Sequence, residues 1–189
     1  DKVLLNFILA ESANKINAEI NYPIDNHLII NSSIEKDWQD KAQKLSQKLL
    51  PEGMEVGLIS IESDTGLIRT MISGRYSEYN QFNRATSAIR PLSSTFKIIP
   101  YCLAFLEGKS LLDTYDDSPT CWENYCPKNF SNFYLGKSTL IESFKHSSNI
   151  VPIKISYQFG LKKVVNLANQ FGIKYKKDLS SYLPIAIGA

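Results

Sequence analysis

The chain lacks the features by which several classes of protein are recognised. Its 189 residues include two histidines and three cysteines, which leaves few of the usual metal ligands. The formal net charge is only +2 and no basic stripe is present, so we set nucleic-acid binding aside. The longest apolar run near the start, residues 4–10, is far shorter than the roughly 20 residues that cross a bilayer. We therefore expect no metal, no cofactor and no membrane span within these residues.

The composition is that of a globular protein. Hydrophobic residues make up 43%, charged residues 21% and aromatic residues 11% of the chain, and such a balance argues against disorder. A chain of this length can bury a core as one domain or as one domain with an appendage. Because it opens at Asp1 without an initiator methionine or signal peptide, we expect it to be cut from something longer.

The three cysteines have different surroundings in the sequence. Cys102 falls in an apolar segment and reads as a small buried hydrophobe. Cys121 and Cys126 lie in a loop that contains proline and asparagine, and the only histidines are His27 and His146. The spacing therefore favours a disulfide, formed in an oxidising compartment, over a metal site.

The most informative stretch is Ser94-Thr95-Phe96-Lys97. If residues 94–106 are helical, Ser94 and Lys97 lie on one face and can share a hydrogen bond, which gives a weak alcohol a local proton acceptor. Two other S-x-x-K matches, at residues 12–15 and 33–36, lie in segments that read as solvated. The residues after Lys97 form an apolar helix with almost no polar face, so burial should lower the pKa of Lys97 and help it to accept a proton.

A second constellation, Ser147-Ser148-Asn149, lies downstream of Ser94. It would place a hydroxyl and a carboxamide in the same cleft. Taken alone, it reads as a turn between helices, where Ser and Asn are common because they hydrogen-bond locally. Because an S-x-x-K sequence on a buried helix lies upstream, we favour the interpretation that Ser147 and Asn149 line a cleft.

Periodicity and turn residues predict the main elements. We expect helices at residues 1–22, 37–50, 94–106, 151–159 and 161–171, and one opened by the capping box Thr139–Glu142. A short strand is expected at residues 28–30, and residues 56–61 and 67–72 should form an antiparallel hairpin. The segment from Cys121 to Leu135 reads as a loop. Since two strands are marginal as a sheet, more strands are expected beyond Ala189.

Several segments in order resemble the transpeptidase domain of the class A penicillin-binding proteins, within the serine penicillin-recognising superfamily. They are Asn31–Gln39, Ile59–Ile68, Phe82-Asn83-Arg84-Ala85, Ser94–Lys97, Pro127–Phe130, Gly136–Leu140, Ser147–Ile150 and Leu183–Gly188. The resemblance implies an α/β (α+β) fold, with an antiparallel sheet and an all-helical subdomain, incomplete at its C-terminus. It divides the chain into a linker region, residues 1–52, and the N-terminal part of the transpeptidase domain, residues 53–189.

The resemblance also implies the chemistry. The parent protein would be a D,D-transpeptidase that cross-links peptidoglycan stem peptides through an acyl-serine and is acylated by β-lactams. Ser94 would be the nucleophile, Lys97 its base and Ser147 a proton relay, while Asn149 would bind the substrate amide. The protein would act at the outer face of the bacterial cytoplasmic membrane or in the periplasm. Its membrane anchor would lie outside this chain. Whether a glycosyltransferase domain precedes Asp1 stays an open question.

The third motif of that family is missing, because no Lys-Thr-Gly or Lys-Ser-Gly occurs in the 189 residues. That motif's strand supplies half of the oxyanion hole, so we expect the chain alone to be a poor enzyme. One alternative is a β-lactam or cell-wall sensing module that is acylated without turnover, and another is a scaffold with a vestigial tetrad. A β-lactamase fits less well, since no segment resembles a deacylating glutamate motif.

Overall fold

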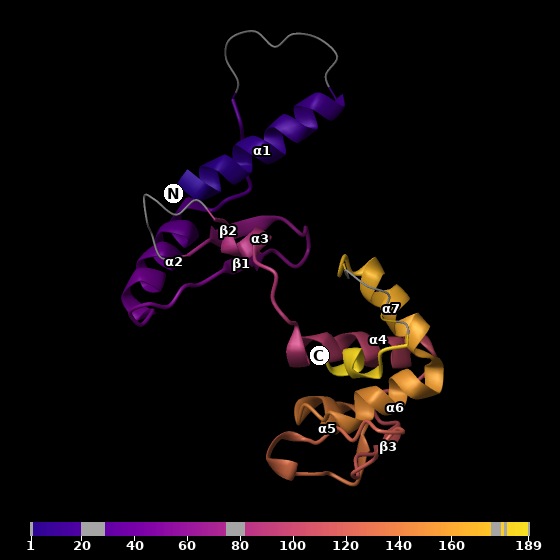
Figure 1. Cartoon of the computed structure of the whole chain (residues 1–189). Coiled ribbons are helices and arrows are strands. Elements are labelled where there is room, and N and C mark those ends of the chain that lie inside the picture. The colour runs from indigo at the N-terminus through magenta and orange to yellow at the C-terminus, as the bar shows by residue number, and fades with distance from the viewer. Residues whose placement is uncertain (1, 20–28, 75–81, 175–178, 180, 189) are drawn as a thin grey trace. The chain divides into compact units, whose positions relative to one another are not determined.

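The computed structural model describes residues 2–19, 29–74, 82–174, 179 and 181–188. The chain divides into two compact units, residues 1–89 and 90–189 (Figure 1). The expected boundary at residue 52 concerns a family domain rather than a compact unit, and it stays a prediction.

The first unit contains helices and one hairpin. Its elements are α1 (Lys2–Glu19), α2 (Lys36–Leu49), β1 (Leu58–Ile61), β2 (Ile68–Ile72) and α3 (Arg84–Ser87). The predicted antiparallel hairpin is confirmed, with Leu58 opposite Ile72 and Ile59 opposite Met71. Helix α2 packs on β2, where the buried Gln39 side chain exchanges two hydrogen bonds with the Met71 backbone, at 2.8 and 2.9 Å. The two predicted helices are confirmed within the described residues.

The strand expected at residues 28–30 is wrong for Ile29 and Ile30, while Leu28 lies outside the described residues. Both residues are irregular, and the Ile29 side chain is 86% exposed. Residues further along the chain contact the edge of β2 instead. The Glu35 N–H donates to the Arg69 carbonyl, and the Ser33 hydroxyl donates to the Ile68 carbonyl. Ile29 and Ile30 have no partner strand in the part of the chain that the structure describes, so they gain no ladder hydrogen bonds.

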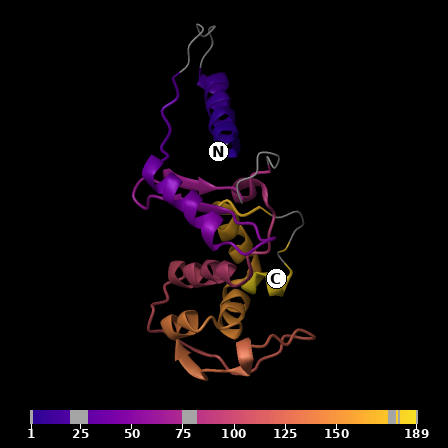
Figure 2. The same ribbon diagram turned by 90° about the vertical axis from the view of Figure 1, so that its left-hand side faces the viewer.

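The second unit is mainly helical (Figures 1 and 2). Its elements are the 3₁₀ helix η1 (Ser93–Lys97), α4 (Ile98–Leu106), β3 (Thr114–Asp116), the 3₁₀ turn η2 (Phe130–Asn132), β4 (Lys137–Thr139), α5 (Leu140–Lys145), α6 (Ile150–Phe159), α7 (Leu161–Gln170) and the 3₁₀ helix η3 (Leu183–Ile187). The predicted capping box is confirmed, since Thr139 and Glu142 hydrogen-bond to each other's backbone N–H. Gly160 ends α6 as expected. The antiparallel pairing of β3 with β4 was not predicted.

The continuous helix predicted over residues 94–106 is two elements. Residues 93–97 form a 3₁₀ helix, and the α-helix begins at Ile98. Pro100 has no N–H to donate to the carbonyl of residue 96, so the α-helical pattern cannot run back through that turn. Pro100 sits in the first turn of α4, where proline is tolerated.

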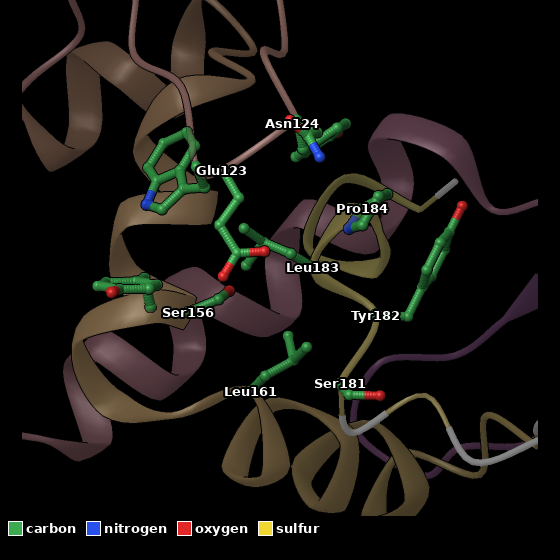
Figure 3. Close-up of a pocket in the computed structure, with 11 residues that line it drawn as sticks. Glu123, Asn124, Ser156, Leu161, Ser181, Tyr182, Leu183 and Pro184 are labelled. Carbon is green, nitrogen blue, oxygen red and sulfur yellow. The ribbon is translucent and has the colours of Figure 1, made fainter.

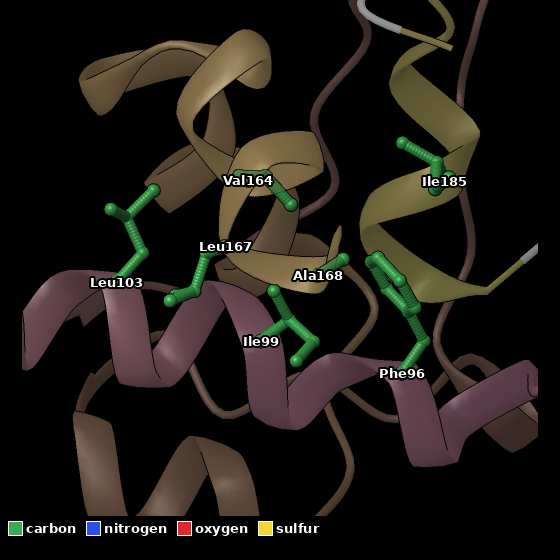
Figure 4. Packing of buried hydrophobic residues seen from close by; sticks show 7 residues of the cluster. All are labelled: Phe96, Ile99, Leu103, Val164, Leu167, Ala168 and Ile185. Carbon is green, nitrogen blue, oxygen red and sulfur yellow. The ribbon is translucent and has the colours of Figure 1, made fainter. Parts of the chain in front are cut away.

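Helix α4 forms the centre of the core of this unit, as the apolar sequence predicted. On one side Phe96, Ile99 and Leu103 pack against the residues of α7 and η3 drawn in Figure 4, which are Val164, Leu167, Ala168 and Ile185. On another side Tyr101 and Ala104 pack against Leu140, Val151 and Ile155. Each fully buried aliphatic or aromatic side chain contributes about 1.5–3 kcal/mol relative to an exposed one. The core therefore fixes the helix that begins directly after Lys97.

The end of η3 supports the start of η1. The Ser93 N–H donates to the Gly188 carbonyl at 3.2 Å. Gly188 has a φ of +77°, and an added Cβ there would overlap the Ser93 backbone. Gly172 also has a φ of +77°, but an added Cβ would meet nothing within 4 Å. The two glycines share a backbone conformation and differ in the space around them.

We predict that Gly188→Ala destabilises the protein more than Gly172→Ala does. The left-handed conformation alone costs an alanine about 1–2 kcal/mol, and only Gly188→Ala must also displace Ser93. Urea unfolding of both variants measures the difference. Equal losses of unfolding free energy would show that Ser93 moves aside without cost.

Candidate functional site

Ser94 and Lys97 lie on the same side of η1. Three residues complete one turn of a 3₁₀ helix, so residues i and i+3 stand directly above each other. The Ser94 side chain is exposed, whereas the Lys97 residue is only 3% exposed. This short element thus presents a hydroxyl to solvent above a buried amine.

The Lys97 amine hydrogen-bonds to Ser147 rather than to Ser94. Lys97 Nζ donates to the Ser147 carbonyl oxygen at 2.7 Å and to Ser147 Oγ at 3.0 Å. Within the described residues the Ser94 hydroxyl makes no hydrogen bond, so the expected Ser94–Lys97 bond is absent. The buried amine turns toward the acceptors on the facing turn, because the exposed serine can bond to water and the lysine cannot.

Burial lowers the pKa of Lys97 from 10.5 to about 8, and the Asp117 carboxylate acts in the opposite direction. Desolvation disfavours the ammonium form and outweighs the attraction of the nearby negative charge. The sequence predicted that burial lowers the pKa of Lys97, and the structure agrees. At pH 7 about one lysine in ten would then be a neutral amine.

Ser147 and Asn149 lie in the turn between α5 and α6. Ser147 has a φ of +53°, an uncommon conformation for a residue other than glycine. Its side chain is exposed and faces Lys97. The Asn149 side-chain amide donates to the Lys128 carbonyl at 2.6 Å, and the Asn149 N–H donates to Asn129 Oδ1 at 2.7 Å. The structure thus brings Lys97 and Ser147 into contact and places Asn149 two residues further on.

A buried polar cluster lies behind this turn, and sequence reasoning missed it. Asp117 is 1% exposed and follows β3 directly. Its carboxylate accepts hydrogen bonds from Asn129 Nδ2 at 2.9 and 3.0 Å, from the Leu135 N–H at 3.0 Å and from Ser148 Oγ. Asp-Asp-Ser-Pro reads as a surface turn, so only the pairing of β3 with β4 reveals that Asp117 is buried.

The loop that carries the disulfide forms a separate feature. Cys121 and Cys126 are bonded, as their spacing favoured. Between them, Trp122 and Tyr125 pair through backbone hydrogen bonds, and Glu123 points into an open cavity next to the start of α7 (Figure 3). The predicted site residues Ser94, Lys97, Ser147 and Asn149 are not among the lining of this cavity.

The described residues contain no cluster of three or more His, Cys, Asp or Glu side chains that could hold a metal ion. Across the same residues, every helix is too short or too polar to cross a membrane. The four predicted site residues carry two hydroxyls, an amine and a carboxamide.

An exposed serine thus lies one 3₁₀ turn from a buried lysine that hydrogen-bonds to a second serine, on a mixed α and β fold. The family model described as "Penicillin binding protein transpeptidase domain" matches residues 57–183. The chain belongs to this family of penicillin-binding transpeptidase domains. The resemblance stated from the motifs is thereby confirmed.

Curated relatives agree with the family. The chain is 31% identical over 147 residues to penicillin-binding protein 1A of Aquifex aeolicus, which covers 75% of this chain and 20% of the relative. It is 29% identical over 143 residues to penicillin-binding protein 1A of Neisseria flavescens, covering 72% and 18%. The chain thus spans about a fifth of the length of these relatives.

Solved structures share the fold. The PonA1 protein of Mycobacterium tuberculosis in complex with penicillin V superposes with a TM-score of 0.80 at 21% identity, covering 99% of this chain and 54% of that one. Penicillin-binding protein 1A of Haemophilus influenzae gives a TM-score of 0.65 at 28% identity, covering 71% and 21%. The expected α+β fold of a penicillin-binding transpeptidase is confirmed, and the described residues form two two-stranded antiparallel sheets, one of them in the mainly helical unit.

We predict that the Lys97 amine titrates near pH 8, more than two units below an ordinary lysine. Lysine ¹³Cε chemical shifts measured against pH, with Lys97 assigned through Lys97→Met, test this. Lys36 serves as an internal control, because its hydrogen bond to Asp40 raises its pKa above 10.5. A Lys97 signal that titrates with the exposed lysines would contradict the assignment.

Proposed function

We propose that the protein to which this chain belongs is a serine D,D-transpeptidase of peptidoglycan and a target of β-lactams. The family and the fold support acyl transfer by a penicillin-binding domain. The single observation that carries the proposal is the buried Lys97 amine. It is hydrogen-bonded to Ser147 and lies one 3₁₀ turn from the exposed Ser94 hydroxyl.

In the proposed reaction, Ser94 Oγ attacks the carbonyl of the penultimate D-Ala of a stem peptide, and Lys97 accepts the hydroxyl proton. The amide bond to the terminal D-Ala breaks, and that D-Ala leaves as an amine after receiving a proton through Ser147. An amine of a second stem peptide then attacks the Ser94 ester. It forms the cross-link and releases the serine. Asn149 would hold the amide backbone of the bound peptide.

A β-lactam would enter at the same step. Ser94 opens the lactam amide, and the ring nitrogen receives the proton, so the acyl-serine retains both halves of the drug. Because such substrates lie outside the cytoplasm, we place the protein at the outer face of the membrane or in the periplasm. The Cys121–Cys126 disulfide fits an oxidising compartment of that kind.

We predict that Ser94→Ala abolishes covalent labelling of the full-length protein by a fluorescent penicillin. Mass spectrometry of the labelled peptide identifies the acylated residue, and circular dichroism confirms that the variant folds. The matched control is Ser12→Ala, which alters the serine of another S-x-x-K sequence, located on α1. Labelling that survives in Ser94→Ala would refute the proposed nucleophile.

The pH dependence follows from the lysine. If Lys97 accepts the proton, its neutral form is the active one, so the labelling rate should rise as the pH increases through about 8 and then level off.

Transfer of the acyl group to an acceptor amine, followed by chromatography of the cross-linked product, separates a transpeptidase from a sensing module that is acylated without turnover.

The chain alone should react slowly. No Lys-Thr-Gly or Lys-Ser-Gly occurs in residues 1–189, and losing one oxyanion donor costs on the order of 100-fold to 1000-fold in rate. We predict that residues 1–189 are labelled at Ser94 at least 100-fold more slowly than the full-length protein is. Equal labelling rates would show that the third motif is dispensable for acylation.

A further inference from the structure

Successive residues of the turn between α5 and α6 face different partners. Ser147 faces Lys97, whereas the next residue, Ser148, is 2% exposed and donates to Asp117. Ser148 Oγ also accepts hydrogen bonds from the Ile150 and Val151 N–H groups at 3.1 and 3.0 Å, which caps the start of α6. The middle residue of the turn is therefore its anchor, and it is anchored to Asp117.

Asn129 provides a second connection from Asp117 to the same turn. Its amide nitrogen donates to both Asp117 oxygens, and its amide oxygen accepts from the Asn149 N–H. Asp117 itself is fixed by the small sheet, since its N–H donates to the Gly136 carbonyl at 2.7 Å, one residue beyond the pairing of β3 with β4. The residue that follows β3 thus holds Ser148 and Asn149, the two residues that follow Ser147.

We propose that Asp117 is a positioning residue for the acylation site. It fixes the turn that presents Ser147 and Asn149, and its negative charge favours the ammonium form that Lys97 adopts after it accepts the Ser94 proton. The expected effect of Asp117 on the rate of acylation rests on the proposed function. Its role in holding the turn rests on geometry alone. Asp117 would thus affect the rate of acylation although its side chain is buried and touches none of the reacting atoms.

The charge of Asp117 acts on Lys97 inside the protein, where solvent screens little. Other titratable groups near the pair are the Tyr101 phenol on α4, whose pKa is raised by burial and by Asp117, the exposed His146 before Ser147, and Lys128, whose carbonyl accepts from Asn149. All three remain in a variant that changes Asp117 alone. A shift in the titration of Lys97 would therefore report the Asp117 charge.

The test compares Asp117→Asn with two further variants in the full-length protein. The double variant Asp117→Asn with Asn129→Asp exchanges the carboxylate and the carboxamide, so a negative charge stays in the cluster and the carboxylate introduced at position 129 can still accept from the Asn149 N–H. The matched control is Asp116→Asn, the same change one residue away, at an exposed carboxylate paired with Lys154. The measurement is the rate of acylation by a fluorescent penicillin as a function of pH.

For Asp117→Asn we expect two effects. The midpoint of the pH profile should fall by about one unit, because removing a nearby opposite charge lowers the pKa of an ammonium. The plateau rate at high pH should fall roughly tenfold, because the turn is less well positioned. Asp116→Asn should match the wild type, and the double variant should recover most of both losses. A purely structural role for Asp117 would lower the urea midpoint without moving the pH midpoint.

A folded Asp117→Asn variant with the wild-type midpoint and plateau would overturn the proposal, as would an Asp116→Asn variant with the same losses. If Asp117→Asn does not fold, the double variant decides, and failure to approach the wild-type profile counts against the proposal. If even the wild type is not acylated, the proposed function fails instead. The ¹³Cε titration of Lys97 in wild type and variant then still decides whether Asp117 acts on it.

Discussion

The removal of one lysine amine from water is the constraint on which this site depends. Lys97 is almost fully buried, and its hydrogen bonds to the Ser147 carbonyl and hydroxyl replace the water it has lost. These bonds join η1 to a turn 50 residues further along the chain. Since a buried amine without partners would be costly, the turn must supply an acceptor at that place. Ser147, whose φ is +53°, presents both its carbonyl and its hydroxyl to this amine.

Two opposing electrostatic effects set the state of that lysine. Burial alone would drive the pKa lower, and the Asp117 carboxylate limits the fall, which leaves the value at about 8. A lysine with an ordinary pKa would be a poor proton acceptor near neutral pH, and one with a very low pKa would hold the accepted proton weakly. In the proposed reaction, the balance between desolvation and a buried negative charge would suit this amine to taking a proton and passing it on.

Local signals in the sequence predicted the parts of the fold that depend on neighbouring residues. Turn residues gave the β1–β2 hairpin, Thr139 and Glu142 gave the start of α5, and the apolar run after Lys97 gave the buried helix. The β3–β4 sheet escaped prediction because each strand has only three residues and twenty residues separate them. A strand that short has no readable alternation, and the pairing that stabilises it is not local.

The same limit explains the missed half of the site. Ser94, Lys97, Ser147 and Asn149 belong to short motifs that can be read from the sequence, whereas Asp117 becomes buried only when β3 pairs with β4. Once Asp117 is placed, Asn129 and Ser148 follow from chemistry, because a buried carboxylate needs donors and these two supply them. The residue types of the proposed site were thus visible in the sequence. The scaffold that orients them depends on contacts between distant segments, so only a three-dimensional structure reveals it.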